Sequence, residues 1–306
     1  MHSVAVLMST YNGERFLREQ MDSILVQEGV AVTLFVRDDG STDRTVEMVR
    51  TFAEKNPNIV FVQGKNVGVG NSFMQLVYGA GETFDYYAFS DQDDIWLSQK
   101  MARAIERIGS EKAPALYCSN QALVDKNGNT LGLRHARPVD TGYLQILCNN
   151  QASGCTMLWN RSLQRLLIDP DRRPSAALLC KRIHDVWVGM VASVAGRFVY
   201  DETAYILYRQ HENNVVGVRK ANVFREWKKK LRNKALRNGR SALATEIVSK
   251  FDDVITSERT RETLRLCATY AGSARKKLAL FRNGAIRRYS QESPWMYGVK
   301  ILLDLF

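Results

Sequence analysis

Short apolar runs that alternate with helical patterns constrain the fold of this chain most strongly. The runs occupy residues 3–8, 32–36, 59–62 and 86–89, and each is followed by a polar loop and a stretch with helical spacing. Such alternation is typical of a largely parallel sheet covered by helices. A chain of 306 residues with 45% apolar content can also bury a full core. The sequence therefore predicts an α/β fold through about residue 110.

Carboxylates cluster where the fourth apolar run ends. Residues 90–96 read SDQDDIW and place Asp91, Asp93 and Asp94 side by side. Repulsion between carboxylates about 4–5 Å apart in a partly dehydrated cleft costs roughly a few kcal/mol, and a bound cation removes that cost. Hard oxygen ligands favour Mg²⁺ or Mn²⁺, with phosphate oxygens completing the shell. On these residues alone, an exposed acidic turn is an equally good interpretation, with Asp94 capping a helix that starts near Leu97.

A second acidic pair favours the metal interpretation. Asp38 and Asp39 follow the run at 32–36, just before Gly40 and a helical pattern. Ligands of open α/β sheets bind at the carboxyl ends of the strands, so the two acidic clusters are expected to face one crevice. The first strand ends there too, in Tyr11, whose ring is suited equally to stacking on a base and to packing over the sheet.

A glycine-rich loop at residues 64–71 resembles a phosphate-binding loop between a strand and a helix. It contains neither GxxxxGK[ST] nor GxGxxG, so it predicts neither a P-loop nor a dinucleotide site.

Four ordered segments together resemble the family 2 inverting glycosyltransferases of the GT-A fold. They are residues 9–12 (STYN), 38–43 (DDGSTD), 66–68 (NVG) and 90–94 (SDQDD). Within that family the chain is most similar to rhamnosyltransferase-like enzymes of bacterial surface-polysaccharide assembly, over roughly residues 2–215. The resemblance implies a GT-A type, Rossmann-like, mostly parallel sheet flanked by helices. This domain would cover residues 1–217, with a nucleotide-sugar half of about 1–97 and an acceptor half of about 98–217.

The resemblance also implies a nucleotide-sugar site. Its residues would be Thr10, Tyr11, Asn12, Asp39, Asn66, Asp91, Gln92 and Asp94. Asp39 would face the base, and Asp91 and Asp93 would form the D-x-D pair, the first near the ribose and the second on the metal. Asp94 would cap the next helix or position the donor sugar. The implied cofactor is Mg²⁺ or Mn²⁺, held by Asp93 and by His211 after a strand at 203–209; an exposed loop histidine is the alternative.

The acceptor side requires a general base, because inversion is a single displacement in which the acceptor hydroxyl loses a proton. Residues 182–188 (RIHDVWV) begin a helix with Asp185 in its first turn, and Asp185 resembles the catalytic aspartate of the family. The alternative is that His184 and Asp185 only complement the helix dipole. Gly154 and Cys155, in the turn at 152–158, match the family segment under the acceptor, where His184 is also expected.

The C-terminal part is distinctly basic. Residues 219–240 hold ten Lys or Arg and one acid, against a net charge of +11 for the chain. With Phe224 and Trp227 at helical spacing, this segment is typical of a helix on an anionic membrane surface, or of one docked on the catalytic domain. Region 218–306 is expected to be helical, roughly at 242–271 and 274–288. Its apolar tail at 297–306 would pack on the domain, on a second copy in a homo-oligomer, or on lipid.

The sequence-based prediction is a cytoplasmic transferase peripheral to the inner face of the cell membrane. Five cysteines without metal spacing indicate reduced thiols, and neither a signal peptide nor a membrane-length apolar run is found. The enzyme would move a sugar from a nucleotide-diphosphate sugar, with dTDP-rhamnose suggested by the likeness, to a saccharide or lipid-linked oligosaccharide in polysaccharide, O-antigen or capsule synthesis. A metal-dependent sugar nucleotidyltransferase is the alternative. A nucleic-acid binder is disfavoured, because the acids occupy the expected cleft.

Overall fold

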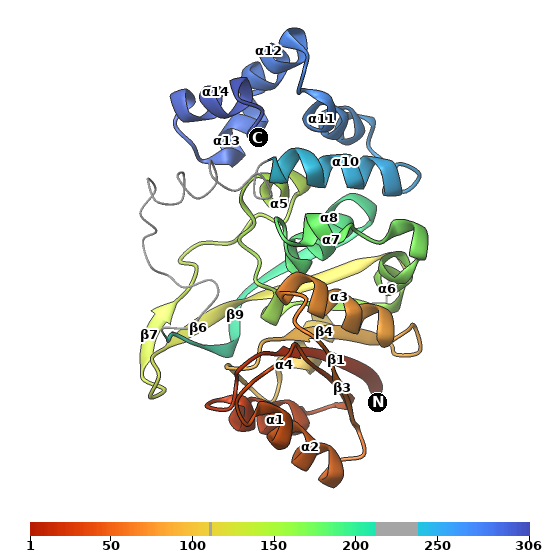
Figure 1. Cartoon of the computed structure of the whole chain (residues 1–306), viewed down its shortest axis with the longest axis vertical. Coiled ribbons are helices and arrows are strands. Elements are labelled where there is room, and N and C mark those ends of the chain that lie inside the picture. The colour runs from red at the N-terminus through yellow and green to blue at the C-terminus, as the bar shows by residue number, and fades with distance from the viewer. Residues whose placement is uncertain (110–111, 212–237) are drawn as a thin grey trace.

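The computed structural model describes residues 1–109, 112–211 and 238–306. Nine strands in these residues form one sheet with helices on both faces (Figure 1). The basic helix predicted at 219–240 and the domain boundary at 217/218 lie almost wholly outside the described residues, so both stay predictions.

The N-terminal half is a parallel α/β unit, as predicted. Strands β1 (His2–Thr10), β2 (Val30–Asp38), β3 (Ile59–Gln63) and β4 (Tyr86–Ser90) pair in the order β3-β2-β1-β4. Helices α1 (Leu17–Leu25), α2 (Thr45–Lys55) and α3 (Val69–Gly79) connect them. The middle of β1 is buried because both faces of the sheet are covered by helices, and its continuous apolar run reflects this.

The second half extends the same sheet. Strand β8 (Leu158–Asn160) lies antiparallel between β4 and β6 (Ala115–Val124), and β9 (Arg197–Arg209) runs parallel to β6. The short strands β5 (Ile95–Trp96) and β7 (Thr130–Leu133) pair antiparallel with β9 and β6. Strands β1–β4, β6 and β9 therefore share one direction and three strands oppose it, so the expected mostly parallel sheet is confirmed.

One local prediction around Asp94 was wrong. The helix expected near Leu97 is α4 (Lys100–Ile108), and its N-cap is Gln99. The residues after Asp94 instead form β5, which pairs with the end of β9. Asp94 accepts a hydrogen bond from the backbone N–H of Arg209 at 3.2 Å, so it joins two strands and does not cap a helix. Pairing with β9, which is distant in sequence, overrode the local capping signal.

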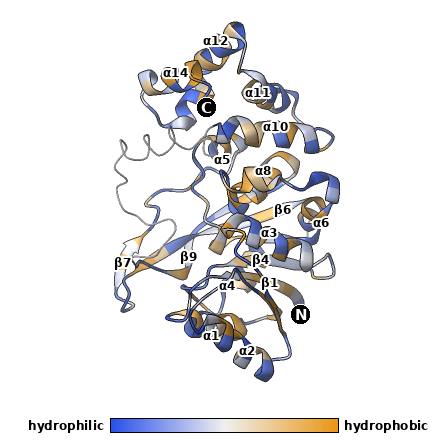
Figure 2. Ribbon diagram, viewed as in Figure 1, coloured by the Kyte–Doolittle hydropathy of each residue, from blue (hydrophilic) through white to orange (hydrophobic). Residues whose placement is uncertain are grey.

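The remaining helices cover the second face of the sheet. They are α5 (Tyr143–Asn149), η1 (Gly154–Thr156), α6 (Arg161–Ile168), η2 (Pro170–Arg172), α7 (Ala176–Leu179) and α8 (His184–Ala195). The turn and strand predicted at 152–158 correspond to η1 and β8. Figure 2 shows apolar residues concentrated on the central strands and on α8, which is buried on nearly all sides.

The C-terminal helices are more broken than predicted. They are α10 (Gly239–Phe251), α11 (Glu258–Thr269), α12 (Ala274–Arg282), α13 (Gly284–Ser290) and α14 (Pro294–Leu302). The expected helices at 242–271 and 274–288 are each interrupted, and the side chains of Ser257 and Asn283 cap the helices that start anew. Each break turns the chain so that the next apolar stripe reaches the core.

A single apolar core joins these helices to the sheet. Trp187 of α8 packs against Phe251 of α10, with ring centroids 5.7 Å apart. The tail predicted to pack on the domain, on a second copy or on lipid buries Tyr297, Ile301 and Phe306 in this core, so part of it packs on the chain itself. No helix in the described ranges is long and apolar enough to cross a bilayer.

Candidate active site

A cleft of about 1110 Å³ lies where β1, β2 and β4 end. The predicted site residues that line it are Tyr11, Asn12, Asp39, Asn66, Asp91, Gln92, Asp93, Gly154, His184, Asp185 and His211. The expectation that acids following separate strands face one crevice is thus met. Thr10, Asp94 and Cys155 are buried and do not line the cleft. These three side chains can affect a bound ligand only through the residues that line the cleft.

Tyr11 stands at the rim beside the acidic turn. The Gln92 side chain accepts a hydrogen bond from the Tyr11 N–H at 2.9 Å and donates one to the Tyr11 carbonyl at 3.0 Å. This exchange ties the loop after β1 to the loop after β4. The tyrosine is 49% exposed, so about half of its surface is open to a ligand.

Asp39 organises the neighbouring glycine-rich loop. Its carboxylate accepts hydrogen bonds from the backbone N–H groups of Val67 at 2.9 Å and Gly68 at 3.0 Å, and from the Arg37 guanidinium at 2.5 Å. Gly40 next to it has φ 85°, and a Cβ there would lie 3.1 Å from the Asn66 nitrogen. The DDG and NVG segments are therefore two halves of one hydrogen-bonded wall.

Asp93 meets His211 across the cleft floor. The Asp93 Oδ2 lies 2.7 Å from the His211 Nε2, and the Arg209 guanidinium donates to the Asp93 carbonyl at 3.1 Å. Arg209 in turn pairs with Glu19 at 2.5 Å and lies over the Phe16 ring. The end of β9 thus fixes the acidic turn from a segment that is distant in sequence.

These two donors fit a divalent metal. In an octahedral site, ligand atoms lie about 2.1 Å from the ion and adjacent ligand atoms about 3.0 Å from each other. The Asp93 Oδ2 and the His211 Nε2 would therefore have to move only slightly apart to bind Mg²⁺ or Mn²⁺. Carboxylate suits both ions and imidazole is acceptable to Mn²⁺. Both side chains also reach the cleft, where phosphate oxygens and water can complete the shell.

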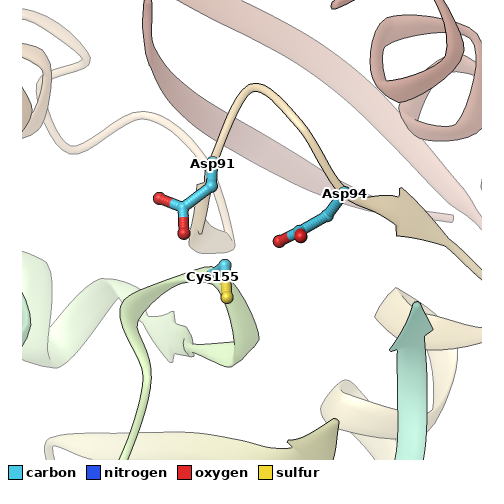
Figure 3. Close-up of side chains that lie close together, drawn as sticks. All are labelled: Asp91, Asp94 and Cys155. Atoms are coloured by element: carbon cyan, nitrogen blue, oxygen red, sulfur yellow. The ribbon is translucent and has the colours of Figure 1, made fainter. Parts of the chain in front are cut away.

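A second cluster lies just beneath (Figure 3). One ligand atom each of Asp91, Asp94 and Cys155 lies within 4.8 Å of the others. Burial, followed by the charges of Asp93 and Asp185, raises the pKa of Asp91 to about 7. Burial likewise raises the pKa of Cys155 well above its usual value. A neutral thiol below the floor is a poor ligand for Mg²⁺ or Mn²⁺, so the pair Asp93 and His211 is the better candidate for a metal site.

A buried lysine faces this lower cluster. Lys100 is 1% exposed, and its ammonium lies 3.7 Å from the centre of the Trp96 ring. Among the described residues, neither its Nζ nor the Asp94 Oδ2 has a hydrogen-bond partner. Burial lowers the pKa of Lys100 to about 7, while the nearby Cys155 and Asp94 oppose that shift. Sequence reasoning missed Lys100, because nothing marks one lysine in a helix as buried.

Asp185 and His184 lie against Gly154, and we call these three residues the acceptor wall after the role predicted for them from the sequence. A Cβ at position 154 would lie 2.9 Å from the His184 Nε2 and 3.2 Å from the Asp185 Cβ, so glycine permits this approach. Burial raises the pKa of Asp185 to about 6, which suits a general base near neutral pH. His184 stacks on Phe73 with ring centroids 3.9 Å apart, and burial lowers its pKa to about 3. It is therefore neutral at pH 7.

Two arginines in the cleft were not predicted. Arg134 follows β7 and lies 5.4 Å from the centre of the Tyr208 ring, and its charge opposes the raised pKa values of Asp91 and Asp185. Arg182 donates to the Leu147 carbonyl at 2.7 Å, and burial together with the charge of Arg240 lowers its pKa to about 10. In the described part of the chain neither arginine forms an ion pair. No motif marks Arg134, because the β6–β7 pairing alone carries it to the cleft.

Comparison with known proteins adds the family. The sequence pattern of Glycosyl transferase family 2 matches residues 5–167. The chain is 31% identical over 219 residues to the dTDP-rhamnosyl transferase RfbG of Shigella flexneri, covering 69% of this chain and 73% of RfbG. It is 25% identical over 160 residues to WfgD of Escherichia coli, a UDP-Glc:α-D-GlcNAc-diphosphoundecaprenol β-1,3-glucosyltransferase, covering 52% of this chain and 61% of WfgD.

Among solved structures, residues 1–349 of S. aureus TarS in complex with UDP-GlcNAc have the same fold. The TM-score is 0.56 at 17% identity, with 100% of this chain and 93% of the TarS chain covered. The complex of the same TarS segment with UDP gives a TM-score of 0.57 at 17% identity, covering 87% of this chain and 69% of the TarS chain. At this level of identity the likeness bears on the fold, and it agrees with the expected GT-A architecture.

Proposed function

The chain belongs to glycosyl transferase family 2, and on that premise we propose that it is an inverting, metal-dependent transferase acting on a nucleotide-diphosphate sugar. The observation that carries this proposal is the shared cleft. Asp39, Asp91 and Asp93 line it together with Asp185. The acids proposed to bind the donor and the carboxylate proposed as the base, Asp185, therefore line the same cleft.

The proposed chemistry is one displacement at the anomeric carbon. The Asp185 carboxylate accepts the proton of the acceptor hydroxyl as that oxygen bonds to the sugar, and the bond from the sugar to the diphosphate breaks. The pKa of about 6 leaves Asp185 mostly ionised at pH 7 while keeping it more basic than an exposed aspartate. His184 stays neutral beside it and shapes the acceptor wall.

The donor side would use the remaining residues. Tyr11 is placed to cover a base, and the wall of Asp39 and Asn66 to border the nucleoside. Asp93 and His211 would hold Mg²⁺ or Mn²⁺, and such an ion supplies charge stabilisation for the leaving diphosphate. Arg209 orients Asp93 through its carbonyl.

The donor and acceptor are proposed from the relatives and from the charge of the cleft. RfbG is named as a dTDP-rhamnosyl transferase, which supports dTDP-rhamnose as the first donor to test. WfgD is named for a lipid diphosphate acceptor. Arg134 and Arg182, which form no ion pair in the described residues, give the cleft cations for such phosphates. We place the reaction at the inner face of the cell membrane, in surface-polysaccharide assembly.

The test is a transfer assay combined with donor binding. Purified protein is screened for thermal stabilisation by dTDP-rhamnose, UDP-glucose, UDP-GlcNAc and GDP-mannose, each with Mn²⁺ and with EDTA. A ligand at 100 times its Kd stabilises by about 2.7 kcal/mol, which is a measurable rise in melting temperature. The stabilising donor is then incubated with polyprenyl-diphosphate sugars, and the anomeric configuration of the product is read by NMR.

The expected result is stabilisation that needs Mn²⁺ and a product with inverted configuration. Pyrophosphate release without sugar transfer would instead indicate a nucleotidyltransferase. A product with retained configuration would contradict the proposed single-displacement mechanism.

A further inference from the structure

Large apolar side chains gather on the outer side of the C-terminal helices. Five of the fourteen large apolar residues that are exposed in the described chain lie between residues 278 and 303. Four of them, which we call the α12–α14 face, are Leu278 (48% exposed), Phe281 (38%), Trp295 (73%) and Leu302 (68%). These helices form the end of the molecule opposite α1 and α2 (Figure 1).

The four side chains form one surface. Leu278 and Phe281 are three positions apart on α12, and Trp295 and Leu302 are seven apart on α14, so each pair lies along one side of its helix. The two stripes meet where the Phe281 ring packs on Gly298, at which a Cβ would lie 3.1 Å from a ring carbon. Lys277 also donates to the Leu302 carbonyl at 3.0 Å. The opposite sides of both helices bury Leu280, Tyr297 and Ile301.

The segment that carries this face is positively charged. Residues 274–306 contain seven Lys or Arg and two acids, which is a net charge of +5. Both acids are already neutralised within the chain, since Glu292 pairs with Arg240 and Lys300, and Asp304 with Lys277. The remaining cations, which form no ion pair within the described residues, are Arg275, Lys276, Arg282, Arg287 and Arg288. The face therefore offers apolar area and cations but no unpaired anion.

We propose that the α12–α14 face binds the surface of an anionic lipid bilayer. A second copy of the chain is a poor occupant, because two C-terminal segments of net charge +5 would be brought together without compensating acids. Anionic headgroups neutralise the cations, while Trp295 and the leucines enter the boundary between headgroups and acyl chains. The proposal uses only described residues and is independent of the basic segment at 219–240.

The face is linked to the acceptor wall. The Asn149 side chain, which lines the cleft, donates to Gln291 at 3.0 Å at the end of α13. Arg240, the first-turn residue of α10, donates to the Cys148 carbonyl at 2.7 Å. Glu292 pairs with Arg240 and with Lys300 of α14, so a membrane bound at the α12–α14 face would contact helices that are joined to the cleft wall. This consequence for catalysis rests on the proposed lipid-linked acceptor, whereas lipid binding itself does not.

The test is co-sedimentation of the full chain with vesicles. Vesicles of phosphatidylcholine alone are compared with vesicles containing equal parts of phosphatidylglycerol. The double variant Trp295→Gln/Leu302→Gln is compared with Val60→Gln/Val62→Gln, which removes two exposed apolar side chains from β3. We expect binding of the wild type to the anionic vesicles, a partition coefficient at least tenfold lower for the α12–α14 variant, and no change for the β3 variant.

Two further readouts make the proposal falsifiable. Brominated lipids should quench tryptophan emission in the wild type and quench it less in Trp295→Phe, which keeps an aromatic, apolar side chain. Thermal stabilisation by the donor and transfer to a detergent-dispersed acceptor should be the same in the wild type and in the α12–α14 variant. These two measurements therefore test the proposed enzymatic function separately from lipid binding. Equal vesicle binding by both double variants would overturn the proposal. So would a dimer in sedimentation velocity that only the α12–α14 variant dissociates.

Discussion

The Asp93 carboxylate lies 2.7 Å from the His211 imidazole, although 118 residues separate them in sequence. The contact joins the turn after β4 to the end of β9, so the two donors proposed for the metal are assembled only when both halves of the sheet are formed. Their separation is close to the edge of a small octahedral coordination shell.

Replacing either donor should remove the metal dependence of donor binding. In Asp93→Asn and His211→Gln we expect the Mn²⁺-dependent part of donor affinity, measured by calorimetry with and without EDTA, to fall at least tenfold. His2→Gln is the matched control, because His2 is exposed and lies outside the cleft. Wild-type Mn²⁺ dependence in Asp93→Asn would argue against this site.

Activity should fall on the acid side with the ionisation of Asp185. Burial raises its pKa to about 6, so the base is ionised above that pH and is lost as the pH falls through it. We expect kcat to decrease about tenfold per pH unit well below 6, measured at saturating donor and acceptor. His184 adds no second limb in this range, because its pKa is lowered to about 3.

Asp185→Asn should abolish transfer and also stabilise the fold. General bases contribute about 10²- to 10⁴-fold in rate, and a loss of that size is expected while donor binding persists. The pKa of Asp185 is about 6 in the folded protein, above its ordinary value of 3.8. The folded state is therefore destabilised as the pH rises from 3.8 to about 6, and this loss of stability remains at higher pH. The amide avoids this cost, so its melting temperature at pH 8 should exceed that of the wild type. Near-normal turnover in this variant would exclude Asp185 as the base.

Gly154→Ala should disturb the acceptor wall selectively. The added Cβ would lie 2.9 Å from the His184 Nε2 and must displace His184 or Asp185. We expect about 1–3 kcal/mol of destabilisation from overpacking, together with a large loss of kcat at unchanged donor affinity. Gly79→Ala is the control, since a Cβ there meets nothing within 4 Å. Its kcat should match the wild type, and its melting temperature should be equal or slightly higher, because alanine suits the end of α3 better than glycine.

Arg240→Met should weaken the contacts between the C-terminal helices and the cleft wall. Arg240 holds the Cys148 carbonyl and pairs with Glu292 at 3.0 Å, and both charged side chains are mostly buried. In the variant, Lys300 still pairs with Glu292, so Glu292 is not left as an isolated buried charge. We therefore expect the free energy of unfolding, measured by chemical denaturation, to fall by about 1–3 kcal/mol. The KM for acceptor should rise while the Kd for donor stays constant. Arg265→Met, at an exposed ion pair with Asp252, should cost under about 1 kcal/mol.

The parallel half of the fold was predictable because its signals are local. Each apolar run, such as residues 86–89, is long enough to indicate a strand, and each is followed by a loop and a helical pattern within a few residues. The acids at Asp39 and Asp91 could be assigned to one edge of the sheet, since parallel strands all end on the same side.

The C-terminal helix boundaries were not predictable in this way. Ser257 and Asn283 cap the helices that start after each break, but a single Ser or Asn is also tolerated inside an exposed helix, so neither residue marks a break by itself. Lys100 was missed for a similar reason: only packing against Trp96 shows that it is buried.

The sequence by itself determined the family, the alternation of strands and helices in the first half, and the types of side chain available for donor binding and base catalysis, because these depend on short-range patterns. Tertiary structure alone decided which of those side chains reach the cleft. It placed Asp94 and Cys155 under the floor, carried Arg134 and Arg182 into the site, and left Trp295 and Leu302 exposed. The physical reason is that burial and charge pairing depend on contacts between segments far apart in the chain, and local patterns carry no information about which segments meet.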